Sequence, residues 1–246
     1  MTLKKRIVVT LLWDGIQVVK PIQFKRPYRK LGPLMQYVNI LEKRNIDELI
    51  LLDIEATAQK RKPKFEELKE FTSQLFCPVT IGGGISELDD IIQLFNCGAD
   101  KVSIRSKSKY LSFIEQVAYK IGNQAITVAI DITKQRDKPE TLLINDIMPT
   151  WAKRIENAGA GEILLTSIDK DGTLNGYDTD LISSVCNAVC VPVIANGGCG
   201  TPAHMLEALN AGADAVAAGS MFLYTSTTPR ECAKYLYEHG VDVRYE

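Results

Sequence analysis

The sequence predicts a closed α/β barrel of eight strands and eight helices. Short aliphatic runs alternate with helix-spaced segments along the whole chain, the length of 246 residues suits eight such units, and one segment recurs in both halves. Strands that are apolar on both faces are typical of a buried parallel sheet, so the alternation favours a (βα)8, or TIM, barrel. An open, doubly wound sheet is the second choice.

The expected strands are the eight β-branched or aliphatic runs. In chain order they are Ile7–Leu12, Leu49–Asp53, Val79–Ile81, Lys101–Ile104, Ala125–Asp131, Glu162–Ser167, Val191–Ala195 and Ala215–Ala218. A helix is expected after each strand, because apolar residues recur there at helical spacing. Proline loses no hydrogen bond in a first helical turn, and it marks several of the expected helix starts, which are Pro33, Pro63, Glu87, Tyr110, Pro149, Asp180, Pro202 and Pro229.

An internal repeat divides the chain into two similar halves. Three segments, Pro78-Val79, Gly82-Gly83-Gly84 and Gly98-Ala99-Asp100, recur at an offset of 114 residues as Pro192-Val193, Asn196-Gly197-Gly198 and Gly212-Ala213-Asp214. We interpret the halves as two (βα)4 modules that close one barrel, and we expect residues 1–246 to form a single domain. Common α/β connectors could explain any one match, but they do not explain the shared register.

The composition limits the class of protein. With 46% hydrophobic and 24% charged residues, the chain can form a sizeable core. Its 29 basic and 30 acidic residues show no excess of the kind that nucleic-acid binders carry. No apolar run approaches the roughly 18 residues of a membrane span, and the apolar stretch near the start is too short for a signal peptide. We therefore expect a cytoplasmic protein that binds neither nucleic acid nor membrane.

Neither a metal site nor a cofactor is predicted. The six cysteines contain no C-x-x-C pair, and the two histidines, His204 and His239, lie far apart in the sequence. We interpret the cysteines as buried thiols.

Residues at the carboxyl ends of the strands are the first candidates for a site, because barrel enzymes act there. Glycines after the last two strands leave backbone N–H groups accessible beside a helix N-terminus, which suits a phosphate, and the matched positions of the first half could hold a second one. Two phosphates at opposite sides imply a long, phosphorylated small-molecule substrate. Alternatively, the glycines only form tight turns. The candidate phosphate-binding residues are Gly82, Gly83, Arg105, Ser106, Thr173, Asn196, Gly197, Gly198, Gly219 and Ser220.

Three aspartates at the same end are candidate acids or bases. Asp131 ends an apolar strand, where a carboxylate contributes little to packing. Asp171 lies in the loop after the sixth strand, and Asp53 ends the second. A solvated strand end would explain Asp131 and Asp53 without catalysis, and a routine Asp-Gly turn would explain Asp171.

Charged residues open four strands at the opposite end of the predicted barrel. They alternate in sign along the chain, and the strand period of two places each on one face with residues such as Val8, Ile50 and Leu164. If that face is inward, opposite charges can pair in a ring, which removes the penalty of burying them alone. If it is outward, they are solvated strand ends. The four residues are Arg6, Glu48, Lys101 and Glu162.

Several segments together resemble the cyclase subunit of imidazole glycerol phosphate synthase, and the match covers essentially the whole chain. The resemblance implies a barrel that takes ammonia from a glutaminase docked at the amino ends of the strands. It also implies a lyase and cyclisation reaction at the carboxyl ends, on a ribulosyl substrate with two phosphates, and a charged ammonia gate at Arg6, Glu48, Lys101 and Glu162. The matching segments are Lys101–Ile104, Val128–Asp131, Ala158–Thr173, Gly176-Tyr177-Asp178 and His239–Arg244.

The catalytic pair implied by the resemblance is incomplete. The family uses aspartates that end the first and fifth strands; the second is Asp131, but the first falls on Leu12. A one-residue slip cannot supply it, because every side chain of that strand would change face. Asp14, two residues further on, is the candidate substitute. The Asn-Thr pair expected after the fourth strand is Arg105-Ser106, and Asn196 stands where serine is usual.

A retained charged gate and retained phosphate loops after the last two strands, together with a changed catalytic pair, resemble the cyclase-like paralogues of surface-polysaccharide (lipopolysaccharide) pathways. That resemblance implies ammonia delivery, together with a glutaminase and a third amidotransferase-like protein, for acetamidino groups on nucleotide-linked sugars. We prefer this function. Two alternatives stay open: a histidine-biosynthesis cyclase with a changed acid, and a barrel that serves only as an ammonia conduit or scaffold.

Overall fold

Eight parallel strands close into a barrel in the computed structural model, which describes residues 4–44, 46–105, 107, 110–134, 142–143 and 148–245. The last strand pairs back onto the first, with Arg6 beside Ala215, so the chain is a (βα)8 barrel as predicted and the open sheet is excluded. Around the barrel the strands are β1 (Arg6–Trp13), β4 (Glu48–Asp53), β5 (Val79–Gly82), β6 (Lys101–Ile104), β7 (Ile126–Thr133), β9 (Glu162–Ser167), β10 (Val193–Asn196) and β11 (Ala215–Ala218).

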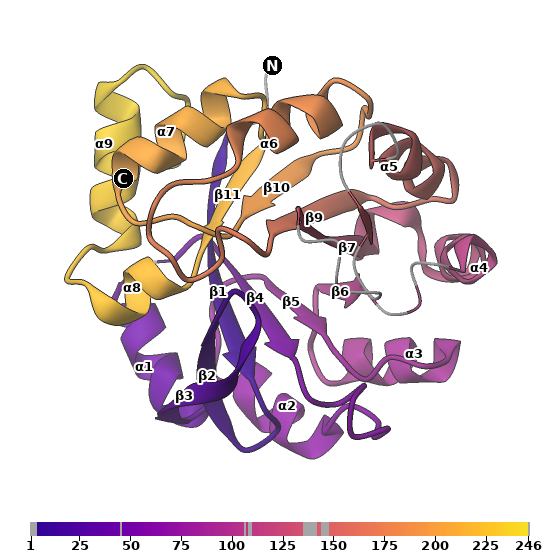
Figure 1. The fold of residues 1–246 in the computed structure, drawn as a ribbon. Helices are drawn as coiled ribbons and strands as arrows, with labels where there is room; N and C mark the ends of the chain where they lie inside the picture. Colours follow the sequence, from indigo (N-terminus) through magenta and orange to yellow (C-terminus); the bar gives the residue numbers. More distant parts are fainter. Residues whose placement is uncertain are drawn as a thin grey trace.

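Helices surround the strands on the outside (Figure 1). Pro149, Pro202 and Pro229 lie in a first helical turn as expected, whereas Pro63 lies two residues before its helix. Within the described ranges, no helix is long and apolar enough to cross a membrane. The helices are α1 (Met35–Lys43), α2 (Phe65–Thr72), α3 (Leu88–Asn96), α4 (Leu111–Ile121), α5 (Met148–Asn157), α6 (Thr179–Cys186), α7 (Pro202–Asn210), α8 (Ser220–Tyr224) and α9 (Pro229–Glu238).

A β-hairpin that the sequence did not predict lies between β1 and α1. It consists of β2 (Gln17–Ile22), which pairs with β1, and β3 (Lys25–Pro33). The helix expected to start near Pro33 begins two residues later, at Met35, because Pro33 is the last residue of β3. The turn holds Gln23 and Phe24 at φ 52° and 59°. Two-residue hairpin turns of this kind usually carry Asn or Gly, so the sequence lacks the ordinary signal.

Smaller differences concern the ends of elements. The strand expected from Ala125 begins at Ile126, because Ala125 belongs to a 3-10 turn, Asn123–Ala125. The strand expected from Val191 begins at Val193. Helix α8 and the two-residue strand β8 (Leu142–Leu143), which pairs with β7, were not predicted.

The barrel encloses an apolar core of its own, separate from the larger core between strands and helices. These inward residues alternate along each strand, as a period of two requires. On β1 the same face carries Arg6 below Val8, and Thr10 and Leu12 above it. The enclosed residues are Val8, Ile50, Ala129, Leu164, Ile194, Ala215 and Ala217, with Leu52 packed against them.

The internal repeat is reproduced in the hydrogen bonds of the two halves. Asp100 accepts a hydrogen bond from the backbone N–H of Val79 at 2.8 Å, and Asp214 accepts one from Val193 at 3.1 Å. In both halves the backbone bond returns, from the aspartate N–H to the carbonyl of the same valine, at 2.9 Å. The Gly-Ala-Asp segments thus join neighbouring strands in the same way.

The cysteines are thiols with no disulfide between them. Cys97, Cys199 and Cys232 are buried as expected, and burial raises the pKa of Cys199 to about 11 and that of Cys232 to about 12. Cys190 is exposed, because it lies in the connection before β10 rather than in the strand, and Cys77 and Cys186 are half-buried. The expectation of six buried thiols is thus wrong for these three.

Candidate functional site

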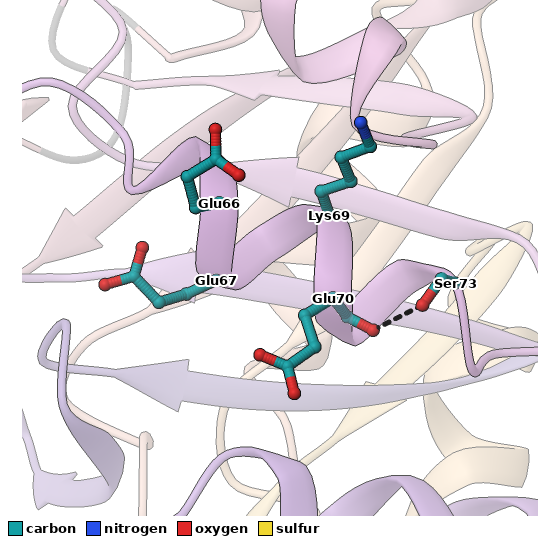
Figure 2. Close-up of a pocket in the computed structure, with 5 residues that line it drawn as sticks. All are labelled: Glu66, Glu67, Lys69, Glu70 and Ser73. Atoms are coloured by element: carbon teal, nitrogen blue, oxygen red, sulfur yellow. Dashed lines mark hydrogen bonds between the residues drawn. The ribbon is translucent and has the colours of Figure 1, made fainter.

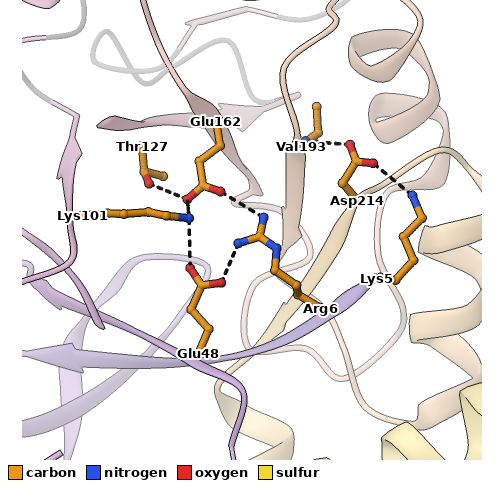
Figure 3. A network of polar contacts seen from close by, with 8 residues as sticks. All are labelled: Lys5, Arg6, Glu48, Lys101, Thr127, Glu162, Val193 and Asp214. Carbon is orange, nitrogen blue, oxygen red and sulfur yellow. Dashed lines mark hydrogen bonds and ion pairs between the residues drawn. The ribbon is translucent and has the colours of Figure 1, made fainter. Parts of the chain in front are cut away.

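A ring of four charged side chains closes the end of the barrel at which the strands begin (Figure 3). Arg6 contacts Glu48 at 2.5 Å and Glu162 at 3.0 Å. Lys101 contacts Glu162 at 2.9 Å and lies 3.6 Å from Glu48. Each carboxylate therefore meets both cations, and of the two alternatives that the strand period left open, the structure has the inward, mutually paired one. We call these four residues the ring.

The carboxylates of the ring are more deeply buried than its cations. The side chains of Glu48 and Glu162 are 7% and 5% exposed, whereas those of Arg6 and Lys101 are 29% and 25% exposed. Burial alone would raise the pKa of Glu162, but the charges of Arg6 and Lys101 and a hydrogen bond from Thr127 together outweigh it and lower that pKa. Glu162 is therefore held as a carboxylate.

At the opposite end, which we call the mouth, Arg105 forms an ion pair with Asp131 through its Nε. The Asp131 side chain is 9% exposed and that of Arg105 is 49% exposed. The guanidinium also lies over the ring of Phe24 in the hairpin turn, 5.8 Å from its centroid. The structure thus joins a predicted acid or base to a predicted phosphate-binding residue.

The pKa of Asp131 differs in direction from that of Glu162. Burial raises it, and the nearby charge of Asp171 raises it further. The charge of Arg105 and hydrogen bonds from Arg105 and Thr166 lower it, but they do not cancel the effect of burial. Asp131 is thus a carboxyl group whose charged form depends on Arg105.

A second ion pair at the mouth joins Lys20 of β2 to Asp171, with 3.4 Å between Nζ and Oδ1. Both side chains are buried, and Asp171 Oδ2 has no hydrogen-bond partner. The sequence reasoning missed Lys20, because the hairpin that carries it was taken as a connection; a lysine within the run Val18-Val19-Lys20-Pro21 was the available signal. The hairpin is fixed over this loop by Gln23, whose N–H donates to the carbonyl of Asp171 at 2.9 Å.

Asp14 and Asp53 hold loops together. Asp14 Oδ1 accepts hydrogen bonds from the N–H groups of residues 16 and 17, both at 2.8 Å, which forms the turn into the hairpin. Arg61 donates to both carboxylate oxygens of Asp53, at 2.7 and 2.8 Å. Leu12 is buried beside Leu52 on the neighbouring strand. The turn accounts for the presence of Asp14 without a catalytic role.

The glycines at the mouth lie against neighbouring backbone. A Cβ atom on Gly83 would lie 2.1 Å from the carbonyl oxygen of Asp53, and one on Gly198 would lie 2.1 Å from that of Gly176. A Cβ on Gly82 would lie 2.8 Å from the carbonyl oxygen of Ser103, and one on Gly197 would lie 2.7 Å from that of Ser167. Packing therefore explains why these positions carry glycine, whatever they bind.

The loop after β11 differs from those glycine turns in two respects. A Cβ on Gly219 would lie 3.3 Å from Lys20 Nζ, so the ammonium group lies beside this loop. The hydroxyl of Ser220 is buried and has no hydrogen-bond partner. The loop at the start of α8 thus has a cation near Gly219 and a buried hydroxyl without a partner at Ser220.

The remaining predicted residues are placed as follows. Asn196 donates to the hydroxyl of Thr166 at 3.0 Å, which connects the end of β10 to the neighbour of Asp131 on β9. Thr173 donates to the carbonyl of Lys170 at 2.7 Å within its own loop. Ser106 lies outside the described residues.

A surface hollow on α2 contains none of the residues of the ring or the mouth. Figure 2 shows its lining side chains on the outer side of the helix, where Ser73 donates to the carbonyl of Glu70 at 2.7 Å. The residues are Glu66, Glu67, Lys69, Glu70 and Ser73. Among the described residues, no group of three or more His, Cys, Asp and Glu side chains is placed to hold a metal ion.

Known proteins resemble this chain along almost its full length. Residues 7–228 match a family described as "Histidine biosynthesis protein". The chain is 40% identical over 255 residues to imidazole glycerol phosphate synthase subunit HisF of a Thermotoga species, with 99% of each chain covered. It is 38% identical over 250 residues to the same subunit of Chlorobium limicola, with 98% of this chain and 99% of the relative covered. It is also 38% identical over 247 residues, with the same coverage, to a Campylobacter jejuni protein named "Putative imidazole glycerol phosphate synthase subunit hisF2". The similarity therefore spans both ends of the barrel.

Proposed function

Since the chain belongs to the histidine biosynthesis protein family and is HisF-like, we propose that it is a cyclase-family subunit that receives ammonia from a glutaminase. The glutaminase docks at the ring, and ammonia passes through the barrel to an acceptor at the mouth. The observation that carries this proposal is the ring, in which two buried carboxylates and two partly exposed cations close the axis of the barrel.

The interior between the two ends favours a small neutral molecule. It is lined by aliphatic side chains such as Val8, Ile50 and Leu164. Ammonia can cross such a region, whereas ammonium would lose its hydration and gain no counter-ion there. The cations are the part of the gate that a docked partner can reach, because Arg6 and Lys101 are several times more exposed than the carboxylates they contact.

A phosphorylated substrate is proposed at the mouth. The loops after β10 and β11 supply backbone N–H groups, and the Lys20 ammonium and the unpaired Ser220 hydroxyl lie beside Gly219. Lysine and a hydroxyl are ordinary partners of a phosphate group. Arg105 and Gly82–Gly84 would serve a second phosphate on the other side.

The preferred acceptor is the precursor of an acetamidino group in surface-polysaccharide synthesis, with a third amidotransferase-like enzyme as partner. Support comes from Leu12, which is buried where the family's first catalytic aspartate stands, and from Arg105 in place of a neutral residue. A histidine-biosynthesis cyclase is the second candidate, favoured by the retained Asp131. A conduit without turnover is the third.

Co-expression with a glutaminase from the same source tests the main proposal. We expect a one-to-one complex and a faster hydrolysis of glutamine in the complex than in the glutaminase alone. Lys101→Met should alter the transfer of ammonia to the mouth, while Lys234→Met, a change in an exposed ion pair on the outer helix α9, should not. Failure of every glutaminase of that source to bind or respond would contradict the proposal.

Cyclisation of the ribulosyl substrate with free ammonium separates the two enzyme candidates. If the loss of an aspartate at Leu12 removed this activity, Leu12→Asp should restore part of it, and Leu12→Asp with Arg105→Asn should exceed either single change. General acid–base help is worth roughly 10²–10⁴-fold, so full recovery is not required. Strong cyclisation by the unchanged protein would favour the histidine-biosynthesis function.

A further inference from the structure

We propose that Asp131 is a resting counter-ion which an anionic ligand displaces from Arg105, so that binding of the anion at the mouth is accompanied by uptake of a proton on Asp131. The ligand class is a dianion with tetrahedral oxygens, such as a phosphate ester. This inference rests on the proposed function, since it concerns the acceptor that enters the mouth.

The placement of Arg105 suits an exchange of partners. The Arg105 side chain is half exposed, while the side chain of Asp131 is buried, so the arginine is the partner that an incoming ligand meets first. Its aromatic neighbour, Phe24, belongs to the hairpin turn and supports the planar group from one side. A guanidinium carries five donors in a fixed fork, which can bind several oxygens of a tetrahedral anion as well as a single carboxylate.

The groups around Asp131 explain why a proton would follow. Besides Arg105, the described groups that face it are the hydroxyl of Thr166 on β9 and the carboxylate of Asp171 in the loop after β9, and Lys20 of β2 is paired with Asp171. When Arg105 turns to another anion, its charge no longer opposes that of Asp171, which raises the pKa of Asp131. A buried carboxyl group beside a second carboxylate favours its protonated form.

The exchange would have a chemical consequence. A protonated Asp131 is a general acid, and it would arise at the time when the anionic ligand is in place. The empty mouth would instead keep the carboxylate neutralised by Arg105. By thermodynamic reciprocity, a lower pH must also strengthen the binding of the anion.

Titration calorimetry with inorganic sulfate tests this linkage on the purified full chain, without a glutaminase. Sulfate keeps its charge between pH 5 and 7, so any proton exchanged comes from the protein or the buffer. Repeating the titration at pH 6 in buffers of different ionisation enthalpy gives the number of protons taken up. We expect the unchanged protein to take up a fraction of a proton, up to about one, per sulfate bound.

Two variants assign that proton. Asp131→Asn should bind sulfate about tenfold more tightly, because Arg105 no longer has to leave a charged partner, and the proton uptake should vanish. Arg105→Asn should abolish both the sulfate binding that depends on Arg105 and the proton uptake coupled to it. Any sulfate that this variant still binds at the loops after β10 and β11 gives the baseline of the titration. Arg105→Lys keeps the charge and should retain proton uptake with weaker binding. Matched controls are Asp89→Asn and Arg154→Asn, both exposed on outer helices.

The inference is overturned if Asp131→Asn binds sulfate no more tightly than the unchanged protein, or if proton uptake persists in Arg105→Asn. Absence of any sulfate binding that depends on Arg105 would overturn it as well. The result is independent of the main proposal: a protein that binds a glutaminase but shows no linked proton refutes only the exchange. A protein that shows the linked proton but binds no glutaminase refutes only the ammonia pathway.

Discussion

The two ends of the barrel both place acids beside bases, yet the arrangements differ. In the ring, Arg6 and Lys101 each contact both Glu48 and Glu162, so that loss of one contact leaves another. At the mouth, by contrast, Arg105 pairs with Asp131 and Lys20 pairs with Asp171. The pKa of Glu162 is lowered and that of Asp131 is raised. The ring therefore neutralises its own buried charges, whereas the mouth keeps a carboxyl group that a ligand can change.

The largest expected effect on stability comes from removing one carboxylate of the ring. Glu162→Gln should lower the free energy of unfolding by about 2–3 kcal/mol at pH 7, because Arg6 and Lys101 then share one carboxylate in a buried setting. Their partial exposure keeps the loss at the lower end for a buried pair. Urea denaturation measures it, with the exposed Glu67→Gln as control, expected within about 0.5 kcal/mol. An equal effect of both changes would contradict the cooperative ring.

The pH dependence of stability should separate the contribution of the Glu162 charge from that of its packing. Because the folded pKa of Glu162 lies below its unfolded value of about 4.3, its stabilisation is complete above that value and is lost as the pH falls through the folded pKa. The difference in melting temperature between the unchanged protein and Glu162→Gln should thus shrink below about pH 4. A difference that stays constant from pH 7 to pH 3 would show that Glu162 contributes through packing alone.

Removing the carboxylate of Asp131 at the mouth should have the opposite effect on stability from removing that of Glu162 in the ring. Since folding raises the pKa of Asp131, its ionised form costs stability at neutral pH, and this cost disappears as the pH falls through the raised pKa. Asp131→Asn removes the cost, and the half-exposed Arg105 can turn to solvent. We expect the free energy of unfolding to stay the same or rise by up to about 1 kcal/mol. A loss as large as that of the ring variant would show that the pair is structural.

The smallest effect is expected in the hairpin turn. Phe24→Ala removes a ring 5.8 Å from the guanidinium of Arg105, a contact worth about 0.5 kcal/mol, while the bond from Gln23 to Asp171 remains. Cleavage by trypsin after Lys25 should become about twofold faster without a change in melting temperature, whereas the Arg26–Pro27 bond is not a trypsin site. Tyr119→Ala, at a side chain that is 95% exposed, is the control. No change in cleavage would mean that Phe24 does not restrain the hairpin.

How much the sequence could predict differs in the same way between the two ends. The strand period placed each of the four charged residues on one face with its aliphatic neighbours, but it left open whether that face points inward, which the structure shows. The mouth depends on loops. Its hairpin turn at Gln23–Phe24 lacks Gly and Asn, so Lys20 was not placed.

The contact of Arg105 with Asp131 was not predictable, although both residues were named as candidates. Strand spacing gives the face of a side chain, but it does not give the rotamer of a long arginine. The two residues were therefore assigned separate roles, and only the structure shows that they contact each other.

Closure of the sheet through β1 and β11 also bears on how the protein is made. Arg6 pairs beside Ala215, so the first strand must wait for the last one to leave the ribosome. At the usual 5–20 residues per second, that wait is roughly 10–40 s, during which β1 offers an unpaired edge. Edges of this kind invite association with other chains. Slower translation should therefore favour aggregation of the nascent first half, and a chaperone that covers the β1 edge should relieve it.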